Sequence, residues 1–462
     1  MNFVKKKLMK RKSNTKLAYF FYLSRNKIKI KNLKNIFFSI YKKIKFKMFS
    51  LKPFLNKAII PVLILILNSF LLGYSIAFPS TTISDLNTYF KFSTSESSLF
   101  SAITSLTAIL GPLYNKFFNK KGNRFTVQMI SLLGLISWTI LLVAPKNCVF
   151  LGILHRILLG ISIGSISALV PGYIMEITPD EFKNVYGVLH QFGITVGIFL
   201  VNLLGIFYKW NVLALISTII SGLIILLMNH VPDTHKSNKK NDFNVGNPNS
   251  IFNMKYRKGL IIGSLMMVFQ QFSGINAVLS NLGTIIQNKF GPSLASSAQC
   301  FSCLICISVI DKIGRKKTWV ISLFGAASSL LLLTVCFSMK LNSIISVLSL
   351  FAFLFFFCFG LGPIPWFLPS EFFPDNVRQT GLSILASLNW IFSFIVIYVY
   401  SILTNLFNET FAFIIFSLIL ICGGFFGMFV LEDKSPMECD VEHLEINSND
   451  SLLEEEDYSF NE

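Results

Sequence analysis

The chain has 462 residues, of which 53% are hydrophobic and only 14% are charged, and its formal net charge is +18. Soluble globular proteins carry about 25% charged residues, so this composition excludes that class and predicts a chain that lies mostly in lipid. Residues 1–57 hold 18 Lys and Arg with no Asp or Glu, whereas residues 432–462 hold 12 acidic residues and one Lys. The positive charge therefore belongs to one terminal segment, and it does not indicate a folded nucleic-acid-binding domain.

Three interpretations of the basic segment remain open. It is a transit-like extension, a segment that binds anionic lipid with its aromatic residues in the interface, or a tail whose Lys, Asn, Ile and Phe content reflects biased codon usage. Its first 16 residues are polar and basic, so we expect no cleavable secretory signal.

Apolar runs of about 20 residues, the length needed to cross a bilayer, recur twelve times through the body of the chain. These runs predict an all-α membrane protein with twelve transmembrane helices. The predicted spans are residues 58–79, 97–114, 125–145, 148–171, 185–208, 211–229, 259–286, 293–310, 318–339, 343–367, 379–404 and 409–431.

The basic residues between the spans predict the orientation of the chain. Five alternate connections carry 16 Lys and Arg, and the other six carry five. Because basic residues accumulate on the cytoplasmic face, both termini are predicted to be cytoplasmic. The predicted domains are a basic extension (1–57), a six-helix bundle (58–229), a linker (230–258), a second six-helix bundle (259–431) and an acidic tail (432–462).

Two short sequence blocks occur once in each predicted half. Gly122-Asn123-Arg124 corresponds to Gly314-Arg315-Lys316, and Glu176 with Pro179 and Lys183 corresponds to Glu371 with Pro374 and Arg378. A parallel duplication of six helices explains the shared spacing, and it predicts a transporter whose site lies between the halves. Acids and bases at these helix ends can pair across the halves as a cytoplasmic gate that opens and closes.

Apart from Glu409, the first residue of the last predicted span, the predicted spans contain no Asp or Glu, and Arg156 is the only permanent charge in their interior. This absence disfavours a proton-coupled mechanism, which usually relies on an intramembrane carboxylate. We interpret His190 as a core side chain that hydrogen-bonds to a neighbouring helix. Cys300, Cys303 and Cys306 form one stripe of a helix and are interpreted as small hydrophobic residues, so no metal site and no cofactor are predicted. Gly160, Gly164 and Ala168 predict close helix packing.

Uncharged amides are the distinctive polar content of several spans, namely Gln191, Gln270, Gln271, Asn276, Gln299 and Asn389. An amide offers donors and acceptors together, which suits a neutral polyhydroxylated ligand, although some of these residues are expected only to join helices. Trp366 and Trp390 offer flat apolar faces on which a sugar ring stacks. Helix breaks, which tend to line transporter cavities, are predicted near Gly274 and in the segment 360–366.

On these residues the chain resembles the sugar porter branch of the major facilitator superfamily, the group of the facilitative hexose transporters. The motifs that carry the resemblance are Gln270-Gln271-Phe272-Ser273-Gly274-Ile275-Asn276, Asp311-Lys312-Ile313-Gly314-Arg315-Lys316, Gly362-Pro363-Ile364-Pro365-Trp366, Pro369-Ser370-Glu371-Phe372-Phe373-Pro374 with Arg378, Pro171-Gly172-Tyr173-Ile174-Met175-Glu176, and His190-Gln191. The resemblance covers residues 73 to about 436 and implies alternating access around a central sugar site.

The resemblance and the repeat together assign two sets of residues. The expected substrate-binding residues are Gln191, Gln270, Gln271, Asn276, Gln299, Trp366 and Trp390. The expected cytoplasmic gate charges are Arg124, Glu176, Lys183, Asp311, Arg315, Glu371 and Arg378. We expect no enzymatic activity, a neutral solute and the bilayer as partners, no nucleic acid, and function as a monomer in the plasma membrane or an organelle membrane.

Departures from the family pattern bear on substrate and coupling. Ser75 stands where proton-coupled members tend to have Asp, which favours a uniporter. Cys358 replaces a glutamate and Ser393 replaces an asparagine near the sugar, and the usual Arg-Gly after the fourth helix becomes Lys183-Asn184. A hexose is therefore the expected substrate, with a polyol, another small neutral metabolite or a solute-sensing transceptor as alternatives.

Overall fold

The computed structural model describes residues 56–233, 251, 254–280, 282, 290–341 and 343–432. The regular elements in these residues are helices. Eleven are long and apolar enough to cross a membrane, and the bent pair α3 and α4 supplies a twelfth candidate span. The predicted all-α fold with twelve spans is thereby confirmed. The predicted N-terminal extension up to residue 55, most of the linker and the acidic tail beyond Glu432 lie outside the described residues.

The first six spans form one group in the chain. Its helices are α2 (Ile59–Phe90), α3 (Thr94–Ala108), α4 (Gly111–Phe118), η2 (Asn119–Lys121), α5 (Asn123–Val143), α6 (Val149–Ile177), η3 (Asp180–Phe182), α7 (Lys183–Leu204), α8 (Trp210–Leu227) and η4 (Met228–His230). We refer to α2 through η4 as the first half.

The second half consists of α9 through α17. Its helices are α9 (Met254–Gln271), α10 (Ile275–Ser280), α12 (Gly291–Ile313), α13 (Arg315–Ser338), α14 (Ser343–Phe356), η8 (Phe357–Leu361), α15 (Ile364–Phe367), η9 (Leu368–Glu371), α16 (Asp375–Leu406) and α17 (Glu409–Phe429). Both predicted breaks are present, one between α9 and α10 and one at η8, which is a π-helical turn.

Several helices run past the predicted spans. The helix α2 continues from the expected end at residue 79 to Phe90, and it carries Asp85 on an exposed surface. Each residue added to a helix gains a backbone hydrogen bond whether or not its side chain is apolar, so a helix can continue beyond its hydrophobic run. The hydrophobic run indicates the part of the helix in the membrane and not where the helix ends. The helix ends where Lys91 adopts a left-handed conformation with φ of 55°.

Equivalent helices of the two halves make equivalent contacts. In the first half α2 contacts α7, and α6 contacts both α3 and α5. In the second half α13 contacts α14 and α17, and α9 contacts α16. Contacts between the halves join α7 to α12 and α6 to α16. The two broken helices also lie where the halves meet, since α10 contacts α2 and α15 contacts α6 and α7.

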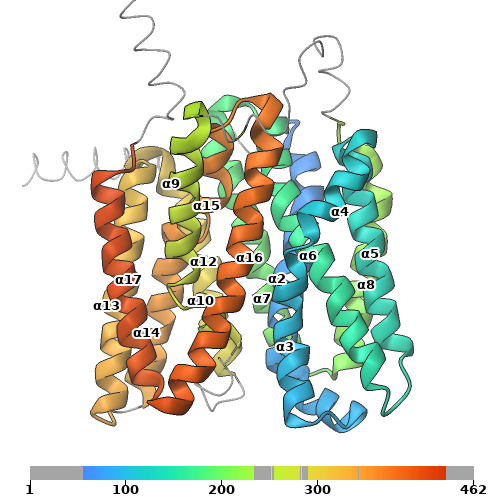
Figure 1. Ribbon diagram of the computed structural model, residues 1–462, viewed down its shortest axis with the longest axis vertical. Helices are drawn as coiled ribbons and strands as arrows, with labels where there is room; N and C mark the ends of the chain where they lie inside the picture. The colour runs from blue at the N-terminus through green and yellow to red at the C-terminus, as the bar shows by residue number, and fades with distance from the viewer. Residues whose placement is uncertain are drawn as a thin grey trace, which may run out of the picture. The chain divides into compact units, whose positions relative to one another are not determined.

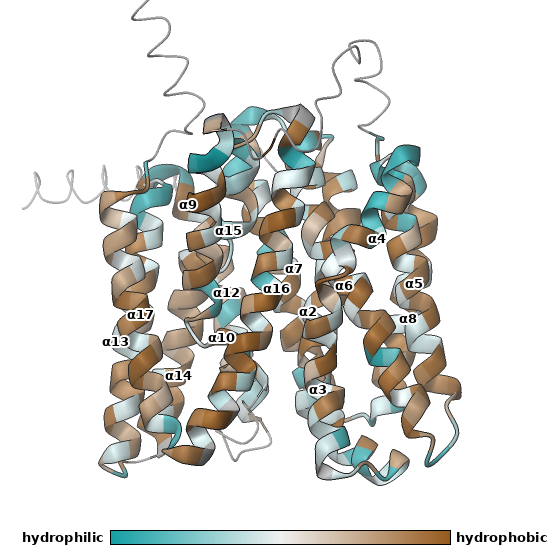
Figure 2. Cartoon of the chain, in the orientation of Figure 1, coloured by the Kyte–Doolittle hydropathy of each residue, from teal (hydrophilic) through white to brown (hydrophobic). Residues whose placement is uncertain are grey.

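The chain of described helices begins and ends on one side of the bundle, the side at which α2 starts and α17 finishes in Figure 1. We call this side the tail end. It also holds the junctions α6–α7 and α12–α13, because successive spans alternate in direction. Figure 2 shows that hydrophilic residues gather at the tail end, whereas the middle of the helices is mostly hydrophobic.

The glycine stripe of α6 forms the close contact that the sequence predicts. A Cβ added at Gly160 or Gly164 would overlap the backbone oxygens of Thr104 and Ala108 in α3. Only hydrogen fits at these positions, so α3 and α6 approach backbone to backbone. By contrast, a Cβ at Gly222 of α8 would meet nothing nearer than Leu135 Cδ1 at 3.8 Å.

We expect Gly164→Ala to destabilise the protein by about 1–3 kcal/mol, because the added methyl group forces α3 away from α6. The matched change Gly222→Ala has room for its methyl group and should leave stability unchanged or slightly improved. Thermal unfolding of the two variants in detergent, followed by tryptophan fluorescence, measures the difference. Equal melting temperatures would show that α3 and α6 are not in close contact.

Candidate functional site

A cavity of about 60 Å³ lies between the two halves. Its lining residues are Leu72, Ile76, Gln191, Ile194, Ile198, Gln270, Gln271, Ile275, Asn276, Leu279, Gln299, Phe357, Trp366, Asn389 and Trp390. The structure thus brings all seven expected substrate-binding residues together around one cavity, with Asn389 as an eighth polar or aromatic member. Among the described residues that line it, none has a charged side chain.

The break between α9 and α10 turns the chain so that three amides face α16. Gly274 has φ of 82°, a left-handed conformation that favours glycine, and a Cβ there would collide with the ring of Phe416. The turn places Gln270 and Gln271 at the end of α9 and Asn276 at the start of α10. A straight helix would send these side chains to different faces.

The cavity amides form a hydrogen-bonded network. Asn389 Nδ2 donates to Gln270 Oε1 at 2.7 Å, and Gln271 Nε2 donates to Asn389 Oδ1 at 3.0 Å. Asn276 Nδ2 donates to Gln271 Oε1 at 2.6 Å and to Ser393 Oγ at 2.8 Å. The network orients each amide from α9, α10 and α16 before any solute enters, which is what a preorganised binding wall requires.

The network is anchored on the broken helix η8–α15. Gln270 Nε2 donates to the carbonyl oxygens of Leu361 at 3.2 Å and Gly362 at 2.9 Å. In an uninterrupted helix the Leu361 oxygen would accept from residue 365, but Pro365 has no N–H group. The amide of Gln270 therefore replaces a backbone donor that the proline removes.

The two expected aromatic residues form part of the cavity wall. Trp390 Nε1 donates to Ser167 Oγ in the first half at 2.8 Å, so its indole offers an apolar face and no free donor. The ring of Trp366 contacts His190, with centroids 6.0 Å apart. Nδ1 of His190 lies 2.7 Å from Ser69 Oγ on α2, in agreement with its interpretation as a hydrogen-bonded core residue.

The first half supplies a mostly apolar wall that the sequence reasoning missed. Leu72 and Ile76 come from α2, and Ile194 and Ile198 come from α7. Residues 191, 194 and 198 are spaced as on one face of a helix. Once Gln191 was expected in the cavity, the same spacing predicted that Ile194 and Ile198 line it too. Polar contact from this wall comes from Gln191, whose Nε2 lies 4.0 Å from Cys358 Sγ.

Gln299 of α12 stands apart from the amide network. Its side chain is 1% exposed, and its Oε1 has no hydrogen-bond partner among the described residues. A buried acceptor without a partner costs free energy, so this oxygen is open to a donor from water or from a solute.

Arg156, the permanent charge predicted inside the membrane, is buried in the first half away from the cavity lining. Its Nε donates to the Phe100 carbonyl oxygen at 3.0 Å and its Nη1 donates to the Ser75 carbonyl oxygen at 3.1 Å. The hydroxyl of Ser75 bonds to the Leu71 carbonyl oxygen instead. Backbone dipoles and the ring of Phe100 thus stabilise the cation.

The expected gate charges gather at the tail end, but the ion pairs of Arg315 and Lys183 form within each half. Arg315 binds Glu371 through two hydrogen bonds of 2.5 and 2.9 Å. Lys183 pairs with Asp180 at 2.6 Å. For these two bases the expected pairing across the halves is not seen, because an acid of the same half lies within reach: Glu371 of η9 for Arg315, and Asp180, three residues earlier, for Lys183.

The remaining gate residues make local contacts. Glu176 Oε2 accepts from Asn123 Nδ2 at 3.0 Å, and Arg378 Nε donates to the Ser370 oxygen at 2.7 Å. Arg124 begins α5 and is half-buried. Asp311, at the end of α12, accepts a hydrogen bond from Asn184 of the first half at 2.9 Å. An uncharged residue therefore makes a contact that crosses between the halves.

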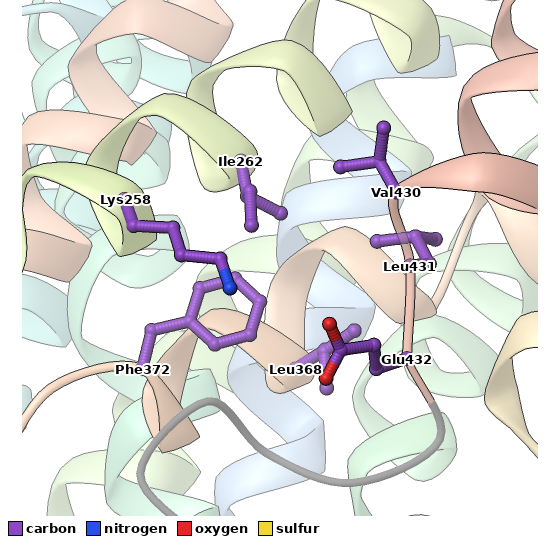
Figure 3. A pocket seen from close by; sticks show the side chains of 7 residues that line it. All are labelled: Lys258, Ile262, Leu368, Phe372, Val430, Leu431 and Glu432. Atoms are coloured by element: carbon purple, nitrogen blue, oxygen red, sulfur yellow. The ribbon is translucent and has the colours of Figure 1, made fainter. Parts of the chain in front are cut away.

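A second pocket, of about 20 Å³, opens between α9, η9 and the end of α17. Figure 3 shows the side chains of Lys258 and Glu432 beside the apolar residues Ile262, Leu368 and Phe372. It contains none of the expected substrate-binding residues, and it lies within the second half. It is accordingly not the candidate transport site.

The comparison with protein families agrees with this geometry. The family described as "Sugar (and other) transporter" matches residues 62–242 and 235–435. The chain is 27% identical to sugar transporter ERD6-like 6 of Arabidopsis thaliana, covering 72% of this chain and 79% of that protein. It is 24% identical to hexose transporter 1 of Plasmodium yoelii yoelii, covering 82% of this chain and 90% of that protein.

Solved structures show the same fold. The structure titled as the proton:xylose symporter XylE bound to 6-bromo-6-deoxy-D-glucose matches with a TM-score of 0.69 and 22% identity, over 82% of this chain and 96% of that one. A human organic anion transporter, MFSD10, matches with a TM-score of 0.62 and 11% identity, over 80% of this chain and 100% of that one. The chain therefore belongs to the sugar (and other) transporter family, the sugar porters of the major facilitator superfamily, and is a multi-pass membrane transporter and not an enzyme.

Proposed function

We propose that this protein carries a neutral monosaccharide, a hexose, across a membrane by alternating access and facilitated diffusion. The observation that carries the proposal is a cavity between the halves whose polar lining consists of amides and indoles without a charged side chain. A charged solute would require a counter-charge in this wall, whereas a neutral polyol surface requires paired donors and acceptors.

The amide network supports sugar binding through exchange of hydrogen bonds. In the absence of solute Gln271 bonds to Asn389 and Asn276, so its polar atoms are satisfied. A hydroxyl group is both a donor and an acceptor, so it can enter between two amides and satisfy each of them again. Gln299 Oε1 has no hydrogen-bond partner among the described residues, so it can accept from a solute hydroxyl without first breaking another bond.

The proposed orientation places the tail end in the cytoplasm, since the basic connections of the chain lie on that side. The relatives support sugar as the substrate class, because the chain matches most of the length of two proteins named as a sugar transporter and a hexose transporter. Cys358 and Ser393, which replace longer polar residues of the family pattern, favour a polyol or another small neutral metabolite as the second candidate.

The proposed uniport mechanism follows from the charges in the membrane. Arg156 is stabilised by carbonyl oxygens from Phe100 and Ser75, and no carboxylate is present among the described residues that line the cavity. A carrier without an acid in the translocation path lacks the usual group that binds and releases a proton in each cycle. Transport is therefore expected to follow the solute gradient alone.

We expect Gln271→Ala to raise the KM for glucose uptake roughly tenfold or more, because it removes one wall contact and leaves Asn389 and Asn276 partly unpaired. Uptake of radiolabelled glucose into proteoliposomes measures the effect. The matched change Gln128→Ala removes a glutamine that joins α5 to α8 by a bond to the Ile225 carbonyl oxygen. Gln128 is not among the residues that line the cavity. Unchanged kinetics in Gln271→Ala would remove this residue from the site.

A protonophore should leave the initial rate of glucose uptake into these proteoliposomes unchanged, since no proton moves with the solute. An imposed pH gradient, acidic outside, should likewise drive no accumulation above the external concentration. Concentrative uptake that the protonophore abolishes would identify a symporter. A panel of hexoses, polyols and charged sugar acids under the same conditions ranks the substrate classes, and binding without flux would indicate a solute sensor.

A further inference from the structure

Asn184 joins the two halves at the tail end. Its side chain lies on the first turn of α7, and its Nδ2 donates to Asp311 Oδ1 at 2.9 Å. Its Oδ1 accepts from Arg315 Nε at 2.7 Å. Asp311 ends α12 and Arg315 begins α13, so one amide of the first half holds an acid and a base of the second half at once.

Arg315 is fixed by several other contacts in the same place. Its guanidinium group binds Glu371 and lies 5.9 Å from the ring centroid of Phe367. That ring is fully buried and rests on Gly187 of α7, where an added Cβ would come within 2.6 Å of the ring carbon Cγ. Asn184 and Gly187 are three residues apart and share a helix face. Asn184 and Gly187 therefore contact a single cluster of the second half, which Arg315, Glu371 and Phe367 form among themselves.

The chemistry of an amide suits this position better than a charge does. A carboxylate at residue 184 would repel Asp311, and an ammonium group would repel Arg315, whereas an amide donates to the first and accepts from the second. Both contacts are charge-assisted, which makes them stronger than bonds between neutral groups. A residue without a polar side chain, such as alanine, loses both.

The face of α7 that carries Asn184 continues into the cavity. Gly187, Gln191, Ile194 and Ile198 follow at spacings of three and four residues, and the last three line the cavity. Because α7 is an unbroken helix from Lys183 to Leu204, its tail end and its cavity face move together. Contact with solute at Gln191 is thus linked mechanically to the contact at Asn184.

We propose that Asn184 is the positioning residue that latches the two halves together at the tail end, and that the latch breaks each time this end opens. The inference rests on the proposed alternating access, but it concerns the equilibrium between closed and open tail ends and needs no knowledge of the substrate. It assigns the link across the halves to a neutral amide. The ion pair with Glu371 holds the guanidinium group of Arg315 in place to donate to that amide.

The test measures distances between spin labels by pulsed electron paramagnetic resonance in solute-free proteoliposomes. Labels carried by a non-natural amino acid at the exposed residues Lys120 and Lys317 report on the tail end, and labels at Lys146 and Met339 report on the opposite end. Asn184→Ala should lower the ratio of closed to open tail ends by at least about fivefold. The opposite end should close in the same molecules, because alternating access couples the two.

A reciprocal exchange separates a latch from a general loss of structure. In the double variant N184D/D311N the new carboxylate accepts from Arg315 and from the amide at residue 311, so all the bonds across the halves can form again. Its distance distributions should return toward those of the unchanged protein. The single variant Asn184→Asp, which places two carboxylates together, should open the tail end as Asn184→Ala does. Glu181→Gln, on an exposed residue nearby, is the matched control and should change nothing.

Unchanged distances in Asn184→Ala, or a double variant that stays as open as the single variants, would overturn the latch. These outcomes do not depend on whether glucose is the solute, since the labels are read without any solute present. Failure of glucose uptake in the unmodified protein would instead count against the proposed function. Broadened distributions at both ends of Asn184→Ala, without recovery in the double variant, would show a folding defect and also reject the latch.

Discussion

The contact between Gln270 and the carbonyl oxygens of Leu361 and Gly362 is the interaction on which the cavity depends. In a bilayer a backbone oxygen without a partner is costly, so a helix broken by proline needs a donor from elsewhere in the protein. Gln270 supplies that donor, and its own oxygen then accepts from Asn389. The break in the tenth span and the polar wall beside it are thus one structural unit, since each satisfies the hydrogen bonds of the other.

In the proposed transport cycle the two walls of the cavity make different kinds of contact with the solute. The second half holds its amides in a mutual network, whereas the first half presents Leu72, Ile76, Ile194 and Ile198 beside the single amide of Gln191. A solute that is hydrogen-bonded to the second half can remain bound while the first half moves across its other side, because apolar contacts do not depend on a fixed direction between the groups. Rocking of one half against the other therefore need not break every polar contact at once.

The fold and the polar wall were largely predictable from the sequence because lipid imposes strict rules. Runs of apolar residues give the spans, and the amides stand out in them as residues that need a partner. The apolar wall was only partly predictable: Ile194 and Ile198 lie on the helix face of Gln191, but Leu72 and Ile76 resemble any lipid-facing residues until α2 is placed. The pairing of Lys183 with Asp180 was missed for a related reason: the sequence indicates which charges gather at one end, but geometry decides which of them touch.

In the contact that Asn184 makes between the halves, both charged partners belong to the second half. Arg315 and Glu371 pair within the second half, and Asn184 of the first half bonds to Arg315 and Asp311 through its amide. An ion pair between the halves would have to separate two charges in each cycle, and the cost of separation rises where water is scarce. An amide exchanges its two bonds for bonds to water without leaving a bare charge of its own. A neutral contact at this position therefore allows firm closure together with a low barrier to opening.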